Sequence, residues 1–133
     1  MGSQNYYDVN SLNMEYSSVY GAWPSDVTLM EEYLKLLDDI DGKFMSYITT
    51  VTTHQPYASQ SEYGDKYLDK FEDTSYSLEL KRYLSKMTEL DNALGVLIDG
   101  LQERNLLDDT IIVLFGDHYP YGCLLYTSDA ADE

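Results

Sequence analysis

The feature that most constrains the fold is a run of five large apolar residues, 111–115, that leads directly into Gly116, Asp117 and His118. Such a run is typical of a strand covered on both faces, as in the parallel sheet of an α/β domain. Ligands of these sheets collect beyond the carboxyl ends of the strands, and Gly116 gives the backbone freedom to turn there. The segment predicts a buried strand that carries two polar side chains at its end.

Asp117 and His118 are candidate metal ligands. A carboxylate oxygen and an imidazole nitrogen suit Zn, Mn or another divalent ion that polarises a phosphoryl or sulfuryl oxygen. The alternative is that Asp117 caps a turn and His118 only packs, since both are ordinary loop residues. The dipeptide alone favours neither interpretation.

Two helices are predicted from apolar residues at helical spacing. The first covers residues 27–37, with Ser25 or Asp26 as its N-cap. The second is a longer amphipathic helix over residues 80–101, with Ser77 as its cap.

A second strand is predicted at residues 44–53, which are dense in aromatic and β-branched side chains. His54 follows its carboxyl end, and a long polar passage over residues 55–76 leads to the second helix. The order strand, helix, strand predicts a βαβ unit with a right-handed crossover and parallel strands. The expected fold is therefore α/β, a partial sheet of parallel strands with flanking helices, in which His54 and the Asp117-His118 pair share one sheet edge.

Composition limits the class of partner. The chain has 24 acidic and 8 basic residues, a formal net charge of -16 and no basic cluster, so it lacks the electrostatic footprint for nucleic acid. Fourteen tyrosines and 44% hydrophobic residues argue against a wholly disordered acidic chain. No run approaches the ~20 apolar residues of a membrane span.

Residues 123–133 resemble the translation of a sequencing adapter, and we expect them to be disordered and to have no packed role. We then expect the natural protein to continue differently past Gly122, so that residues 1–122 are a fragment of a longer protein. Cys123 is the single cysteine. Without it, the natural portion has no disulfide scaffold.

Two separated motifs together resemble one family. Residues 44–57, FMSYITTVTTHQPY, and residues 109–119, DTIIVLFGDHY, are similar in order and spacing, with the helix between them, to the lipoteichoic acid synthase family of the sulfatase and alkaline phosphatase superfamily. A lone Gly-Asp-His would be a weak signal, whereas two motifs and a helix are specific. The resemblance covers most of residues 6–122 and implies that residues 1–122 are a fragment of a sulfatase-like catalytic domain, with Met1 an internal codon.

The resemblance implies a phosphoglycerol transferase that moves glycerol phosphate from phosphatidylglycerol, or a related anionic lipid head group, to a growing polymer. It implies a catalytic domain outside the cell, tethered to the membrane by helices that this fragment lacks. Asp117 and His118 would bind a catalytic divalent cation, Mn or Mg, and His54 would contact the substrate phosphate. By itself His54 is compatible with a structural role at a strand end; its predicted place beside Asp117 and His118 favours substrate contact.

The sequence departs from the family pattern at the nucleophile. The family's catalytic threonine, an acidic metal ligand and a tryptophan-arginine element belong upstream of Met1 and are absent. The threonines of residues 44–53 are interpreted as strand residues, Trp23 as a core contact and Asp26 as a cap. No catalytic residue is assigned, and we expect the fragment to be inactive.

Other functions remain open. The same metal frame serves sulfatases and phosphoethanolamine transferases, and a sulfatase would carry its Cys or Ser motif upstream. A non-catalytic acidic surface module that holds no metal is a second alternative. A third is a fragment that cannot fold, because it exposes sheet edges and apolar helix faces.

Overall fold

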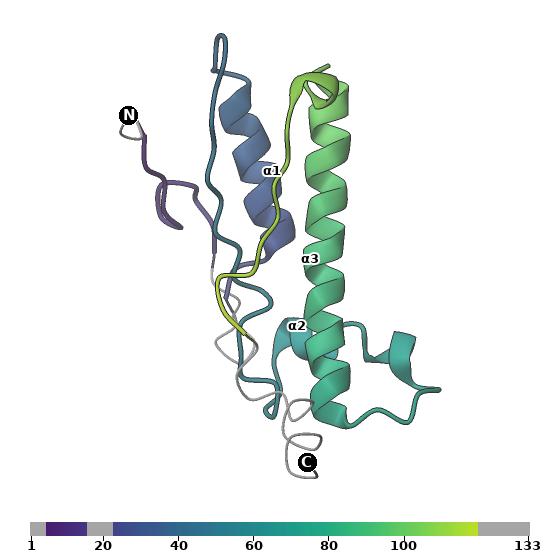
Figure 1. Cartoon of the computed structure of the whole chain (residues 1–133). Coiled ribbons are helices and arrows are strands. Elements are labelled where there is room, and N and C mark those ends of the chain that lie inside the picture. The colour runs from purple at the N-terminus through teal and green to yellow at the C-terminus, as the bar shows by residue number, and fades with distance from the viewer. Residues whose placement is uncertain (1–4, 16–22, 120–133) are drawn as a thin grey trace.

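The structure is a computed structural model that describes residues 5–15 and 23–119, so the predicted tail at 123–133 lies outside the described residues. The elements, in chain order, are α1 (Asp26–Leu37), α2 (Glu62–Asp65), the 3-10 helix η1 (Leu68–Phe71), α3 (Leu78–Glu103) and the 3-10 helix η2 (Leu107–Asp109). The long helices α1 and α3 lie side by side and point in the same direction (Figure 1). Within the described residues, no helix is both long and apolar enough to cross a membrane.

Both long helices begin where the sequence predicts, at a serine cap. The Ser25 hydroxyl accepts a hydrogen bond from the Val27 N–H at 3.0 Å. The Ser77 hydroxyl accepts one from the Leu80 N–H at 3.2 Å. Each cap satisfies a backbone donor that the first helical turn leaves without a partner.

α3 ends in a turn that reverses the chain. Asn105 has a positive φ of 55°, a conformation that Asn tolerates better than most residues. Its N–H donates to the Gln102 carbonyl at 3.0 Å, and the Leu106 N–H donates to the Leu101 carbonyl at 2.9 Å, which is the Schellman pattern. The chain that follows then runs back along the helices (Figure 1).

An apolar seam between α1 and the C-terminal half of α3 forms the core. Its buried residues are Met30, Leu34, Leu37, Ala93, Leu97 and Leu101. The helices approach closely at Gly100, where an added Cβ would overlap the Leu34 Cδ1 atom and lie 2.7 Å from Cδ2. Glycine at this position therefore permits the contact between the two helices.

The predicted α/β fold is wrong for the part of the chain that the structure describes, which is helical and contains no strand. Residues 44–53 and 110–116 run as extended chain in the same direction (Figure 1), but no backbone hydrogen bond joins them among the described residues. The predicted parallel sheet and its right-handed crossover are therefore absent here.

The physical reason lies in what a strand requires. A helix satisfies its backbone within one segment, whereas a strand needs a neighbour on which to pair. The two extended segments meet through side chains, such as the rings of Tyr47 and Phe115, whose centroids are 6.2 Å apart. Residues 111–115 were predicted to be buried on both faces, yet Ile111 is 90% and Val113 72% exposed.

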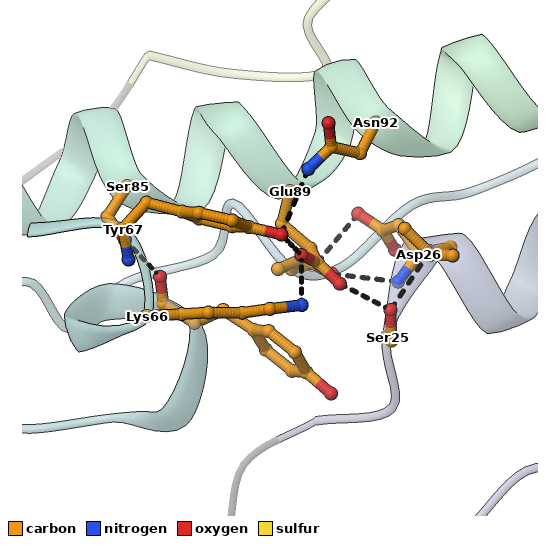
Figure 2. Close-up of polar contacts among 10 residues, drawn as sticks. Ser25, Asp26, Lys66, Tyr67, Ser85, Glu89 and Asn92 are labelled. Carbon is orange, nitrogen blue, oxygen red and sulfur yellow. Dashed lines mark hydrogen bonds and ion pairs between the residues drawn. The ribbon is translucent and has the colours of Figure 1, made fainter. Parts of the chain in front are cut away.

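The carboxylate of Glu89, in the middle of α3, joins three parts of the chain (Figure 2). Its side chain is 1% exposed. The Ser25 hydroxyl, at the start of α1, donates to Oε1 at 2.7 Å. Oε2 accepts from the Tyr67 hydroxyl at 2.6 Å and from the Lys66 ammonium at 2.8 Å. One buried group thus fixes both the start of α1 and the turn after α2 to α3.

These contacts decide the charge of the pair. Burial acts to raise the pKa of Glu89, but the hydrogen bonds from Lys66, Ser25 and Tyr67 outweigh burial and hold that pKa below its ordinary value. Partial burial acts to lower the pKa of Lys66, and its bonds to Glu89 and Tyr67 raise it instead. Both partners are therefore charged at neutral pH.

The helix contact at Gly100 predicts opposite effects for two glycine substitutions in α3. Gly95→Ala meets no atom within 4 Å and should gain about 1 kcal/mol from helix propensity. Gly100→Ala has the same gain but forces Leu34 to repack, at a cost of about 1–3 kcal/mol. We expect Gly100→Ala to be less stable than Gly95→Ala by that cost in urea unfolding followed by circular dichroism. Equal stabilities would contradict the close approach of α1 and α3.

Replacing the buried carboxylate, in Glu89→Gln, should lower the free energy of unfolding by about 2 kcal/mol at pH 7, because the bonds to an ionised group are lost. Since the folded-state pKa of Glu89 is depressed, its stabilisation is complete above the unfolded value of about 4.3 and disappears as pH falls through the lower folded value. Urea unfolding at several pH values measures the difference.

The exposed acid Asp99 on the same helix provides the control, and Asp99→Asn should leave stability within about 0.5 kcal/mol at each pH. The gap between wild type and Glu89→Gln should narrow from pH 7 to pH 3, because the depressed folded-state pKa of Glu89 makes its stabilisation fade as the carboxylate is protonated. A gap of the same size at pH 3 and pH 7 would contradict an ionised Glu89.

Candidate functional site

The structure brings the predicted site residue His54 close to the neighbouring pair Asp117 and His118. His54 follows the first extended segment and His118 the second, and their ring centroids lie 6.3 Å apart with the planes at 89°. The Trp23 ring lies 6.2 Å from the His54 ring. The two histidines are neighbours, as predicted, although the described residues form no sheet edge to hold them.

Both imidazoles make the same backbone contact. Nδ1 of His54 lies 2.7 Å from the Gln55 carbonyl oxygen, and Nδ1 of His118 lies 2.7 Å from that of Tyr119. A carbonyl oxygen only accepts, so Nδ1 donates in each ring and the neutral imidazole carries its lone pair on Nε2. Metal-binding histidines are commonly oriented by a hydrogen bond of this kind.

Asp117 lies next to the same group of rings. Its Oδ1 atom is 3.8 Å from Nε2 of His118. A carboxylate oxygen and an imidazole nitrogen are suitable ligands for a divalent cation. Over the described ranges, no group of three or more His, Cys, Asp or Glu side chains could hold a metal ion.

The approach to His54 is fixed by a buried carboxylate at the start of α1. Asp26 is fully buried and accepts hydrogen bonds from the N–H groups of Val51, at 2.8 Å, and Thr52, at 3.0 Å. Its own N–H donates to the Thr52 hydroxyl at 3.0 Å. Burial raises the pKa of Asp26 against these bonds, which act to lower it. Asp26 is therefore an internal anchor, while Ser25 is the cap.

α3 holds the other side of His54. The Lys86 ammonium is buried and donates to the carbonyl oxygens of His54, at 2.6 Å, and Pro56, at 3.3 Å. Burial lowers the pKa of Lys86. The histidine is thus placed between an anchor on α1 and an anchor on α3.

The polar passage over residues 55–76 is also tied to α3. Arg82 pairs with Asp65 at 2.7 Å and donates to the Ala58 carbonyl at 2.8 Å. The Ser85 hydroxyl donates to the Tyr63 carbonyl at 2.6 Å. This passage, which the sequence predicts to be a long loop, contains α2 and η1 and lies against the helix.

Sequence reasoning assigned no role to Lys86 or Glu89, but a signal was present. The buried positions of α3 keep helical spacing along its whole length and are Arg82, Ser85, Lys86, Glu89, Ala93, Leu97, Gly100 and Leu101. They are polar in the first half of the helix and mostly apolar in the second. Charged residues that continue an apolar stripe indicate buried polar anchors, because they occupy the same helix face.

The chain is similar to several known proteins over most of its length. It is 30% identical over 118 residues to a Rhizobium meliloti (strain 1021) protein named for cyclic beta-1,2-glucan modification, with 87% of this chain and 18% of the relative covered. It is 29% identical to the lipoteichoic acid synthase-like YvgJ of Bacillus subtilis (strain 168) and 24% identical to the lipoteichoic acid synthase of Staphylococcus aureus (strain USA300). Each of these two matches covers 89% of this chain and 18% of the relative.

The chain thus spans about a fifth of the length of these relatives, 18% in each case. No solved structure matches it. The resemblance to lipoteichoic acid synthases that the two motifs indicate is confirmed by the named relatives. The profile described as Sulfatase matches residues 1–128, and the chain therefore belongs to the sulfatase family.

Proposed function

We propose that this chain is part of a metal-dependent phosphoglycerol transferase of the lipoteichoic acid synthase type. The observation that carries the proposal is the meeting of His54 and His118, from two distant motifs, with ring centroids 6.3 Å apart. The names of two relatives, a lipoteichoic acid synthase and a protein like it, support the choice of reaction.

Asp117 and His118 would hold the divalent cation, Mn or Mg. When bound, the cation would offset the charge of a phosphodiester and favour ionisation of an attacking hydroxyl. A positive charge at the site is especially important here, since an anionic substrate approaches a chain of formal net charge -16. His118 would bind the cation through Nε2, because its Nδ1 contacts the Tyr119 carbonyl oxygen.

His54 would bind the substrate phosphate. Its Nδ1 already donates to the Gln55 carbonyl, which leaves Nε2 to meet a phosphate oxygen. Once protonated, that nitrogen donates a charge-assisted hydrogen bond, which is stronger than a neutral one. The exposed position of His54 lets a substrate reach the ring.

The proposed donor is phosphatidylglycerol or a related anionic lipid head group. The enzyme would carry its catalytic domain outside the cell, on a membrane tether, and its threonine nucleophile would come from a segment outside this chain. The chain by itself would then bind the cation and the phosphate without completing the reaction.

A sulfatase is the second candidate, because the matching family is described as Sulfatase. A sulfate ester and a phosphodiester both present anionic oxygens to a cation and an imidazole. The two candidate functions differ in which anion the site should bind more tightly. The affinities for a small phosphate ester and a small sulfate ester measure that preference directly.

Manganese binding tests the proposed metal site. We expect Mn²⁺ added to the 133-residue chain to broaden the ring NMR signals of His118 and His54 before other signals, and EDTA to reverse the effect. Asp117→Asn and His118→Ala should each weaken Mn²⁺ affinity by roughly tenfold or more, since even outer groups of a metal site contribute that much. Calorimetry measures the affinity.

Asp109→Asn is the matched control, because Asp109 is an exposed acid in η2 close to the site in sequence. It should change Mn²⁺ affinity less than twofold if the ion does not simply collect on an acidic surface. With Mn²⁺ present, glycerol 1-phosphate should bind more tightly than methyl sulfate. Tighter sulfate binding favours the sulfatase, and broadening spread evenly over the acidic residues would overturn the metal site.

A further inference from the structure

Residues 53–57 form the loop that carries His54, and the ammonium group of Lys86 lies inside it. Nζ donates to the carbonyl oxygens of His54 and Pro56 and lies 5.5 Å from the centroid of the Tyr57 ring. The Tyr57 hydroxyl in turn donates to the Thr53 carbonyl at 2.9 Å. This stretch of chain curves around one buried cation.

Packing alone does not account for a lysine at this position. Lys86 is 5% exposed, and the ion pairs found in the described part of the chain do not include it. A buried ammonium without a carboxylate partner is unfavourable, and an apolar side chain of similar length would fill the space at lower cost. What a methionine could not do is donate hydrogen bonds to the carbonyl groups of the loop.

The His54 ring depends on its backbone for its position. The residue is exposed, and its ring meets the Trp23 and His118 rings at centroid distances of 6.2 and 6.3 Å. The Trp23 contact is tilted and the His118 contact is edge-on, and each such pair contributes only modestly to stability beyond the area that it buries. The loop behind the ring is firmly held, because Lys86 binds two of its carbonyls and the Tyr57 ring packs at 5.2 Å on Tyr83 of α3.

We propose that Lys86 is a positioning residue: by holding the carbonyl oxygens of His54 and Pro56, its ammonium places the His54 imidazole beside His118, where it binds the phosphate of the substrate. The contact with phosphate rests on the proposed function. The positioning of the ring does not, and it can be measured separately.

The test uses the full 133-residue chain with the variants Lys86→Met, His54→Ala and the double variant, and with Lys81→Met as control. Lys81 lies on the same helix, is less buried than Lys86, and its substitution also removes one positive charge. NMR contacts between the His54 ring and the Trp23 and His118 rings report positioning. Calorimetry with glycerol 1-phosphate and Mn²⁺ reports anion binding, and circular dichroism reports helix content.

We expect Lys86→Met to lose the ring contacts and to weaken glycerol 1-phosphate binding by about tenfold, the loss of one hydrogen bond to a charged group, at unchanged helix content. Lys81→Met should keep the ring contacts and weaken binding less than twofold. If Lys86 acts through His54, the double variant should bind no more weakly than His54→Ala. Additive losses would overturn the proposal.

The outcomes distinguish the positioning role of Lys86 from the phosphate contact of His54. If Lys86→Met keeps the ring contacts, the positioning role is wrong even where His54→Ala weakens binding. If His54→Ala leaves affinity unchanged, the phosphate contact fails, and the ring contacts alone decide whether Lys86 positions His54. If Lys86→Met loses helix content, the test is made on the wild-type chain by measuring NMR contacts from the Lys86 ε-methylene to His54 and Pro56. The absence of these contacts would overturn the proposal.

Discussion

A single buried carboxylate sets the arrangement on which the rest of the structure depends. Glu89 is almost fully buried, and its two oxygens bind groups from the start of α1 and from the turn after α2. Removing a charged oxygen from water is favourable only where donors replace the lost water. The donors Ser25, Lys66 and Tyr67 come from separate segments, so those segments must meet at this point of α3. Their meeting fixes where α1 begins and where the polar passage crosses the helix.

The two halves of α3 contact different parts of the chain, because its buried face is polar in the N-terminal half and apolar in the C-terminal half. The C-terminal half packs its apolar residues on α1, and the close approach at Gly100 makes that contact tight. The N-terminal half binds residues 54–65, including α2, with Arg82, Ser85 and Lys86, each of which donates to a backbone carbonyl. Irregular segments cannot pair their own backbone groups, and buried side-chain donors supply the missing partners. The helix therefore supports the loop of His54 directly.

The sequence predicted the helices well and the strands badly, for one physical reason. α1, α3 and their serine caps follow from residues within a few positions of one another, because helical hydrogen bonds are local. A strand depends on neighbours elsewhere, and residues 44–53 and 111–115 have the right side chains without a backbone partner among the described residues. The anchors Asp26 and Lys86 were missed because their partners lie far away in sequence. Nothing in the local pattern names those partners.

The meeting of His54 and His118 was predicted from a sheet edge that the described residues do not form, so another constraint must produce it. The Schellman turn at Asn105 reverses the chain at one end of α3, and the following residues return along the helices (Figure 1). The first extended segment also runs back along the helices. Its end is held by Asp26, which accepts from the Thr52 N–H, and by Lys86, which donates to the His54 carbonyl. Both segments run along the same pair of helices (Figure 1), and the His54 and His118 rings that follow them have centroids 6.3 Å apart. The proximity of the imidazoles thus accompanies the shared course of the two segments and the two buried anchors of the first, without backbone pairing between the segments in the part of the chain that the structure describes.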